Sequence, residues 1–77
     1  MLTTYPEIRD RIYQPARQRG FRVEWVDVTR DRRKVLIYDS RQLRIAASEV
    51  PLRRYDRPTL ARLAAALTEV LGEGWME

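Results

Sequence analysis

The fold is decided by residues 21–47, which read FRVEWVDVTRDRRKVLIYDSRQLRIAA. Apolar and polar side chains alternate over residues 21–25, and Leu43, Ile45 and Ala47 occupy alternate positions further on, as in strands with one buried face. Residues 35–38 are apolar at every position, which predicts a central strand that is covered on both faces. Short polar segments of turn length separate the three runs. The stretch therefore predicts a three-stranded antiparallel meander.

Two features interrupt this alternation. Val26 and Val28 belong to the face opposite Val23, which predicts either a bulge or a sheet that is partly buried on both faces. Pro51 lacks the N–H group that a strand donates to its neighbour. Residues 49–55 are therefore expected to form a loop, or at most an extension of an edge strand.

A helix is predicted before the meander, over residues 5–18. Thr4 and Glu7 have the spacing of a capping box, and Pro6 lies in the first turn, where its missing N–H group has no cost. Pro15 is expected to kink or interrupt this helix, because it cannot donate the hydrogen bond of a helix interior.

A second helix is predicted after the meander. Asp56 is a suitable N-cap, and Pro58 follows it in the first turn. Gly72 is a natural end for this helix. We expect Trp75, in the short segment that follows, to pack back onto the body of the protein.

These elements predict a small α+β domain of residues 1–77, in which the three-stranded meander packs against two helices in the order α-β-β-β-α. The expected core residues are apolar side chains that share one face of a predicted strand or helix. They are Trp25, Val35, Ile37, Ile45, Ile8, Ile12, Leu60, Leu63, Leu67 and Leu71.

The sequence contains no histidine and no cysteine. Their absence removes the usual general base, the thiolate nucleophile and the commonest metal ligands. The carboxylates have no spacing that is typical of a two-metal or paired-carboxylate site. We therefore expect no catalytic residue, no metal and no cofactor. The alternative is a metal-free ribonuclease that uses Arg, Lys and Tyr.

The sequence also lacks the features of a targeting segment. Residues 1–7 have neither a basic nor an apolar region of a secretory signal, and no apolar run approaches the roughly 20 residues of a membrane helix. We expect a cytoplasmic protein that does not interact with membranes.

Basic residues are concentrated in the middle of the chain. Twelve of the fifteen fall within residues 17–57, against six acidic residues, so this section has a net charge of +6. They form four clusters, at Arg17, Arg19 and Arg22; at Arg30, Arg32, Arg33 and Lys34; at Arg41 and Arg44; and at Arg53, Arg54 and Arg57. Such a charge distribution indicates an anionic partner.

Two of these clusters make up the candidate site. They are Arg30, Arg32, Arg33 and Lys34 in the first predicted turn, and Arg53, Arg54 and Arg57 before the second helix. One guanidinium group can bind two oxygens of the same phosphate. The clusters therefore predict contact with the phosphates of DNA or RNA. Tyr38 and Tyr55 are candidates for stacking on bases, although aromatic residues of small sheets more often belong to the core. The simpler alternative is that the turn is polar only because it is exposed.

A second hypothesis comes from the predicted second helix. Its outer face carries Ala61 and Ala65 and little charge, which is typical of a covered surface but also of a strong helix former. The protein would then be an interaction adaptor or regulator, most simply a homodimer through this face.

The order of the elements and the Ala-rich second helix resemble the topology of the double-stranded RNA-binding domain over residues 5–71. That family begins its second helix with a lysine-rich run, where this chain has Arg53-Arg54-Tyr55-Asp56-Arg57-Pro58. The resemblance implies a fold that can bind a duplex by its shape.

Overall fold

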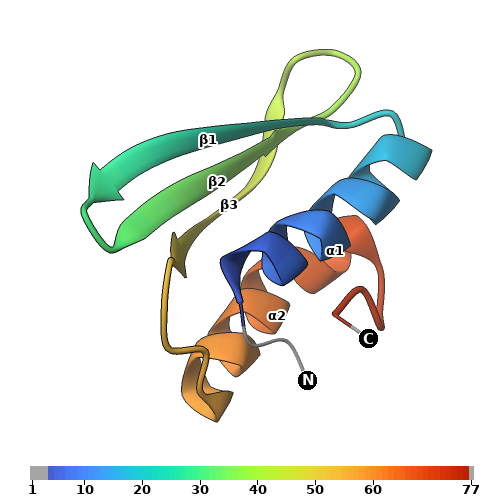
Figure 1. Cartoon of the computed structure of the whole chain (residues 1–77). Helices are drawn as coiled ribbons and strands as arrows, with labels where there is room; N and C mark the ends of the chain where they lie inside the picture. The colour runs from blue at the N-terminus through green and yellow to red at the C-terminus, as the bar shows by residue number, and fades with distance from the viewer. Residues whose placement is uncertain (1–3, 77) are drawn as a thin grey trace.

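The structure, a computed structural model, describes residues 4–76, which form two helices and one three-stranded antiparallel sheet (Figure 1). The elements in chain order are α1 (Tyr5–Gln18), β1 (Arg22–Thr29), β2 (Arg32–Tyr38), β3 (Arg44–Pro51) and α2 (Arg57–Leu71). The sheet order is β1-β2-β3, so the apolar strand β2 is central. The predicted α+β fold and the order of its elements are confirmed.

Both helices lie on the same side of the sheet (Figure 1). The sheet contributes Val35, Ile37 and Val50 to the core, each with no exposed surface. The helices contribute Ile8, Ile12 and Ala16 from α1 and Leu63, Leu67 and Leu71 from α2. The spacing of three or four residues places each helical set on one stripe, which is the stripe that the sheet covers.

The opposite side of the sheet carries neither helix, and we call it the open face. Because side chains alternate along a strand, its residues follow from the pairing of the strands. They are Arg22, Glu24 and Val26 of β1, Arg32, Lys34, Leu36 and Tyr38 of β2, and Arg44, Ala47 and Glu49 of β3.

Helix α1 begins at the predicted cap. The Thr4 hydroxyl accepts a hydrogen bond from the Glu7 N–H (3.4 Å) and donates one to the Glu7 carboxylate (2.9 Å). The helix is not interrupted at Pro15 and continues to Gln18, the end that the sequence predicts. Burial of Ile12 and Ala16, on either side of Pro15, holds this last turn against the sheet and offsets the lost hydrogen bond.

Helix α2 also has the predicted boundaries. The Asp56 carboxylate accepts a hydrogen bond from the Thr59 N–H (3.0 Å), and the helix ends before Gly72, whose φ of 94° favours glycine. Trp75 is buried beyond this end, as expected, and its indole N–H donates to the Thr68 hydroxyl (3.3 Å). No helix within residues 4–76 is long and apolar enough to cross a membrane.

The predicted phase of the third strand was wrong. Ile45 was expected in the core but is 37% exposed, whereas Val50, which the sequence placed in a loop or an extension of an edge strand, lies in edge strand β3 and is fully buried. The register shifts beside Ile45, because Ile37 pairs with Ala46 while Tyr38 pairs with Arg44. The extra residue reverses the side on which the following side chains point. Pro51 ends β3 without disturbing the sheet because β3 is an edge strand.

The core prediction needs two smaller corrections. Trp25 and Leu60 are only partly buried and pack against the core rather than within it. The pairing of β1 is regular at Trp25 and Val26, where the sequence suggested a bulge, and the register shifts only between Asp27 and Thr29. Val26 and Val28 are both exposed.

Candidate nucleic-acid interface

The turn between β1 and β2 lies beside the loop between β3 and α2. Arg32 pairs with Pro51 in the sheet, and the Leu52 N–H donates to the Asp31 carbonyl (2.8 Å). Strands β2 and β3 are antiparallel, so the start of one meets the end of the other. The register of the sheet therefore brings together residues 30–32 and 53–57, which we call the basic end. It holds five arginines and two aspartates.

A hollow of about 410 Å³ lies between this turn and this loop. Its lining residues come from both segments and from the first turn of α2. They are Asp31, Arg32, Pro51, Arg53, Arg54 and Thr59. With three guanidinium groups and one carboxylate, the hollow carries a net positive charge and groups of the kind that bind phosphate.

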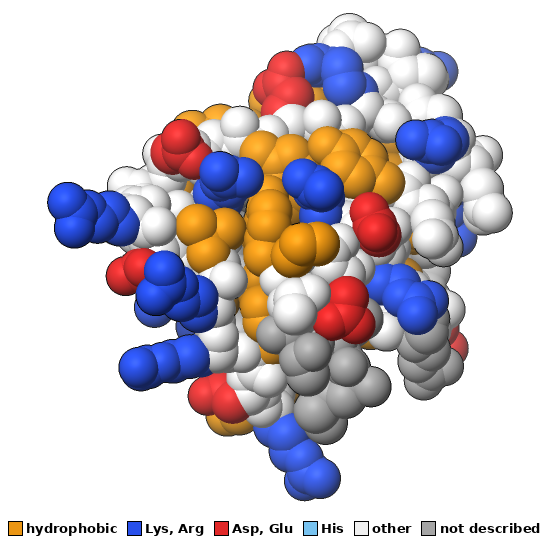
Figure 2. Space-filling view, in the orientation of Figure 1, with side chains coloured by type: hydrophobic (Ala, Val, Ile, Leu, Met, Phe, Trp, Pro, Cys, Tyr) orange, Lys and Arg blue, Asp and Glu red, His pale blue; other side chains and the backbone are white. Residues whose placement is uncertain are grey.

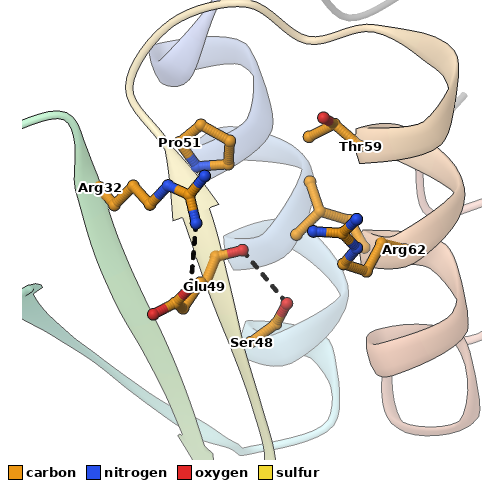
Figure 3. Close-up of a pocket in the computed structure, with 7 residues that line it drawn as sticks. Arg32, Ser48, Glu49, Pro51, Thr59 and Arg62 are labelled. Atoms are coloured by element: carbon orange, nitrogen blue, oxygen red, sulfur yellow. Dashed lines mark hydrogen bonds and ion pairs between the residues drawn. The ribbon is translucent and has the colours of Figure 1, made fainter.

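Arg32 also borders a second hollow, of about 210 Å³, between β3 and α2. In Figure 3, Arg32 approaches it from the sheet and Arg62 from α2, with Glu49 on the strand between them. A guanidinium nitrogen of Arg32 lies 3.4 Å from a carboxylate oxygen of Glu49, and both side chains are about half exposed (54% and 50%). Such exposed pairs are weak, so an incoming phosphate can replace Glu49 at low cost.

Arg33 has a different environment from its neighbour. It follows Arg32 in β2 and therefore points to the helix side of the sheet. Its Nε donates to Asp27 (3.0 Å), another nitrogen donates to the Tyr5 hydroxyl (3.2 Å), and the guanidinium lies over the Tyr5 ring, 5.3 Å from its centre. The hydrogen bond to Tyr5 raises the pKa of Arg33 further above its ordinary value. Arg33 thus links the sheet to α1 and lies outside the hollow.

The other predicted site residues are divided between two places. Lys34 lies on the open face, between Val26 and Glu49 of the neighbouring strands. Arg30 and Arg57 are exposed in the two segments of the basic end. Figure 2 shows several Lys and Arg side chains projecting along its left edge, the side on which Figure 1 has the β1–β2 turn and the start of α2.

The loop before α2 has an unusual backbone at Arg54. Its φ of 63° lies in the left-handed region, which costs an L-residue roughly 1–2 kcal/mol. No sequence signal indicated this, because Arg is not a residue that favours such a turn. The conformation turns the chain between Pro51 and α2 and places Arg54 on the hollow.

The positive end of α2 is already occupied. The hydrogen bonds from Thr59 to Asp56 lower the pKa of that carboxyl, which therefore stays ionised at the start of the helix. The positive charge of the basic end therefore comes from its arginine side chains, while Asp56 offsets the positive end of the helix.

The remaining two basic clusters lie at the opposite end of the sheet. Arg22 and Arg44 are both paired with Tyr38, at the end of β2 that is farthest from Arg32. Arg22 forms an ion pair with Glu24 and donates to the Gln42 side chain (2.9 Å). The four clusters of the sequence thus form two groups, one at each end of the strands.

Within residues 4–76, no group of three or more Asp or Glu side chains is placed to hold a metal ion. Comparison of the chain with protein-family models, curated proteins and solved structures found no match.

Proposed function

We propose that the protein is a small non-enzymatic binding module of the cytoplasm that contacts the phosphates of DNA or RNA through the arginines of the basic end. The observation that carries the proposal is the shared hollow, which Arg32 enters from the sheet and Arg53 and Arg54 enter from the loop. Arg30 and Arg57 add two exposed cations in the same segments. A site of this composition provides sequence-independent affinity, because phosphates carry no base information.

The test is fluorescence anisotropy with labelled single-stranded and duplex oligonucleotides of random sequence. The variant with both Arg53→Gln and Arg54→Gln should bind at least about tenfold more weakly than the parent, since it loses two charge-assisted contacts. The matched control carries Arg17→Gln and Arg19→Gln, two exposed residues where α1 ends and the chain leads into β1, and loses the same charge away from the basic end. Equal affinities of the two variants would contradict the proposal.

The alternative function is that of an interaction adaptor or regulator, acting as a homodimer through α2. The observation that favours it is the exposure of Ala61 and Ala65 on the side of α2 away from the core. Light scattering at high protein concentration tests it directly. A dimer that becomes a folded monomer with Ala65→Glu supports the adaptor, and a parent protein that is monomeric at all concentrations excludes this dimer.

A further inference from the structure

The open face has the composition of a binding surface for a polyanion. Its two carboxylates both lie beside an arginine of the same face, Glu24 beside Arg22 and Glu49 beside Arg32. Lys34 and Arg44 form no ion pair with any described residue. The face as a whole is therefore positive from one end of β2 to the other, and it is continuous with the hollow through Arg32, which belongs to both.

The middle of the open face is apolar and lies between these cations. Leu36 pairs with Ala47 across β2 and β3, and both are only partly buried. Val26 of β1 is 47% exposed. Exposed apolar surface between cations is suited to a partner that has both charged and apolar parts, as a nucleotide chain does.

Tyr38 supplies an aromatic surface at the far end of the open face. The guanidinium of Arg22 lies over its ring, with the guanidinium carbon 4.4 Å from the ring centre. A flat cationic group thus already stacks where a base would stack. Arg22 is about half exposed and is held there by Glu24 and Gln42, contacts that a base and its phosphate can replace.

The distance from Arg32 at the hollow to Tyr38 at the far end of β2 matches the length of a short single strand. Tyr38 lies six residues beyond Arg32 along β2, which corresponds to about 20 Å. Single-strand-binding folds contact segments of about four nucleotides or more through such a combination of basic groove and aromatic surface. The internal bases of a duplex are stacked on one another, so they have no free face for Tyr38.

From these contacts we infer that the open face binds single-stranded nucleic acid, with phosphates in the hollow at Arg32, Arg53 and Arg54, the backbone passing Lys34, and a base stacked on Tyr38. This inference rests on the proposed function, because it uses the same phosphate site. It adds that the ligand is single-stranded and that the open face is the surface that distinguishes it from a duplex.

The experiment compares a labelled oligodeoxythymidylate of about eight nucleotides with a duplex of about the same number of phosphates. The parent should bind the single strand more tightly. Tyr38→Leu should weaken single-strand binding about tenfold, while Tyr38→Phe retains it, because stacking needs the ring and not the hydroxyl. Lys34→Gln provides a second test at a side chain outside the core, and Arg17→Gln on α1 is its charge-matched control. A urea titration of each variant verifies that it is folded.

Three results would overturn the inference. The first is a folded Tyr38→Leu protein that binds the single strand as tightly as the parent does. If the Arg53→Gln, Arg54→Gln variant still binds weakly, that result leaves the proposed function intact. The second is tighter binding of the duplex than of the single strand. The third is a stable dimer that buries Tyr38, seen as protection of its ring from iodination. If the parent protein showed no salt-sensitive binding to either ligand, the proposed function would be contradicted together with the inference.

Discussion

Adjacent arginines at the start of β2 have separate roles. Arg32 lies on the open face with a weak partner, whereas Arg33 is bonded to Asp27 and Tyr5 on the helix side. The sequence identified both as site residues because it shows a basic cluster, and it could not show which of them has a partner. That difference follows from the alternation of the strand together with the position of α1.

Replacing Arg33 should therefore affect stability and not binding. Arg33→Gln loses the contacts to Asp27 and Tyr5, and we expect a lower urea midpoint with oligonucleotide affinity within about twofold of the parent. Arg32→Gln should show the reverse, with weaker binding and nearly unchanged stability, because its ion pair with Glu49 is exposed. The roles of the two arginines would be contradicted if Arg33→Gln abolished binding in a fully folded protein.

Tyr55 should make the protein less stable as the pH becomes alkaline. Burial raises the pKa of Tyr55 to about 12, and its hydroxyl donates to the Pro51 carbonyl. In the unfolded chain the same group ionises near its ordinary value of 10.0. The neutral form is thus favoured by folding, and its contribution is complete below pH 10 and lost as the pH rises toward 12.

This dependence can be measured by urea unfolding at about pH 9 and about pH 11. The parent should lose part of its stability between the two values. Tyr55→Phe should be less stable than the parent at the lower pH, because it lacks the hydrogen bond to Pro51, but should lose less on going to the higher pH. Equal pH dependence in both proteins would show that Tyr55 is not the responsible group.

At the scale of the elements, local signals predicted the helices better than the strands. The caps at Thr4 and Asp56 depend only on neighbouring residues, and both are where the sequence has them. The phase of β3 depends on the extra residue at Ile45, which reflects how the turn after Tyr38 closes. Asp39 organises this turn by accepting hydrogen bonds from two backbone N–H groups, and no alternation of side chains indicates the resulting register.

The contact of α2 with the sheet should carry much of the stability. Leu67 has no exposed surface, and Leu67→Ala should lower the free energy of unfolding by about 2–5 kcal/mol through lost burial and a residual cavity. Leu43→Ala is the control, since Leu43 is 60% exposed and its replacement should change stability by less than about 0.5 kcal/mol. Both values come from denaturant unfolding, and similar losses for the two variants would mean that α2 does not form the core described here.

At the scale of the whole molecule, charge was visible in the sequence but its arrangement was not. The sequence contains four basic clusters, and the pairing of Arg32 with Pro51 joins two of them at one end. The other two lie at the far end beside Tyr38. This division depends on which strands pair and in which register, and these are long-range features that a one-dimensional charge pattern does not contain.

The most direct test of the phosphate site is how the affinity of the protein for nucleic acid depends on salt concentration. With about five phosphates of duplex DNA neutralised, a plot of log affinity against log salt should have a slope of about −4.5, and the Arg53→Gln, Arg54→Gln variant should make it shallower by about two. The Arg17→Gln, Arg19→Gln control should keep the slope of the parent. An affinity that does not respond to salt, or a slope that the Arg53, Arg54 variant leaves unchanged, would contradict the account.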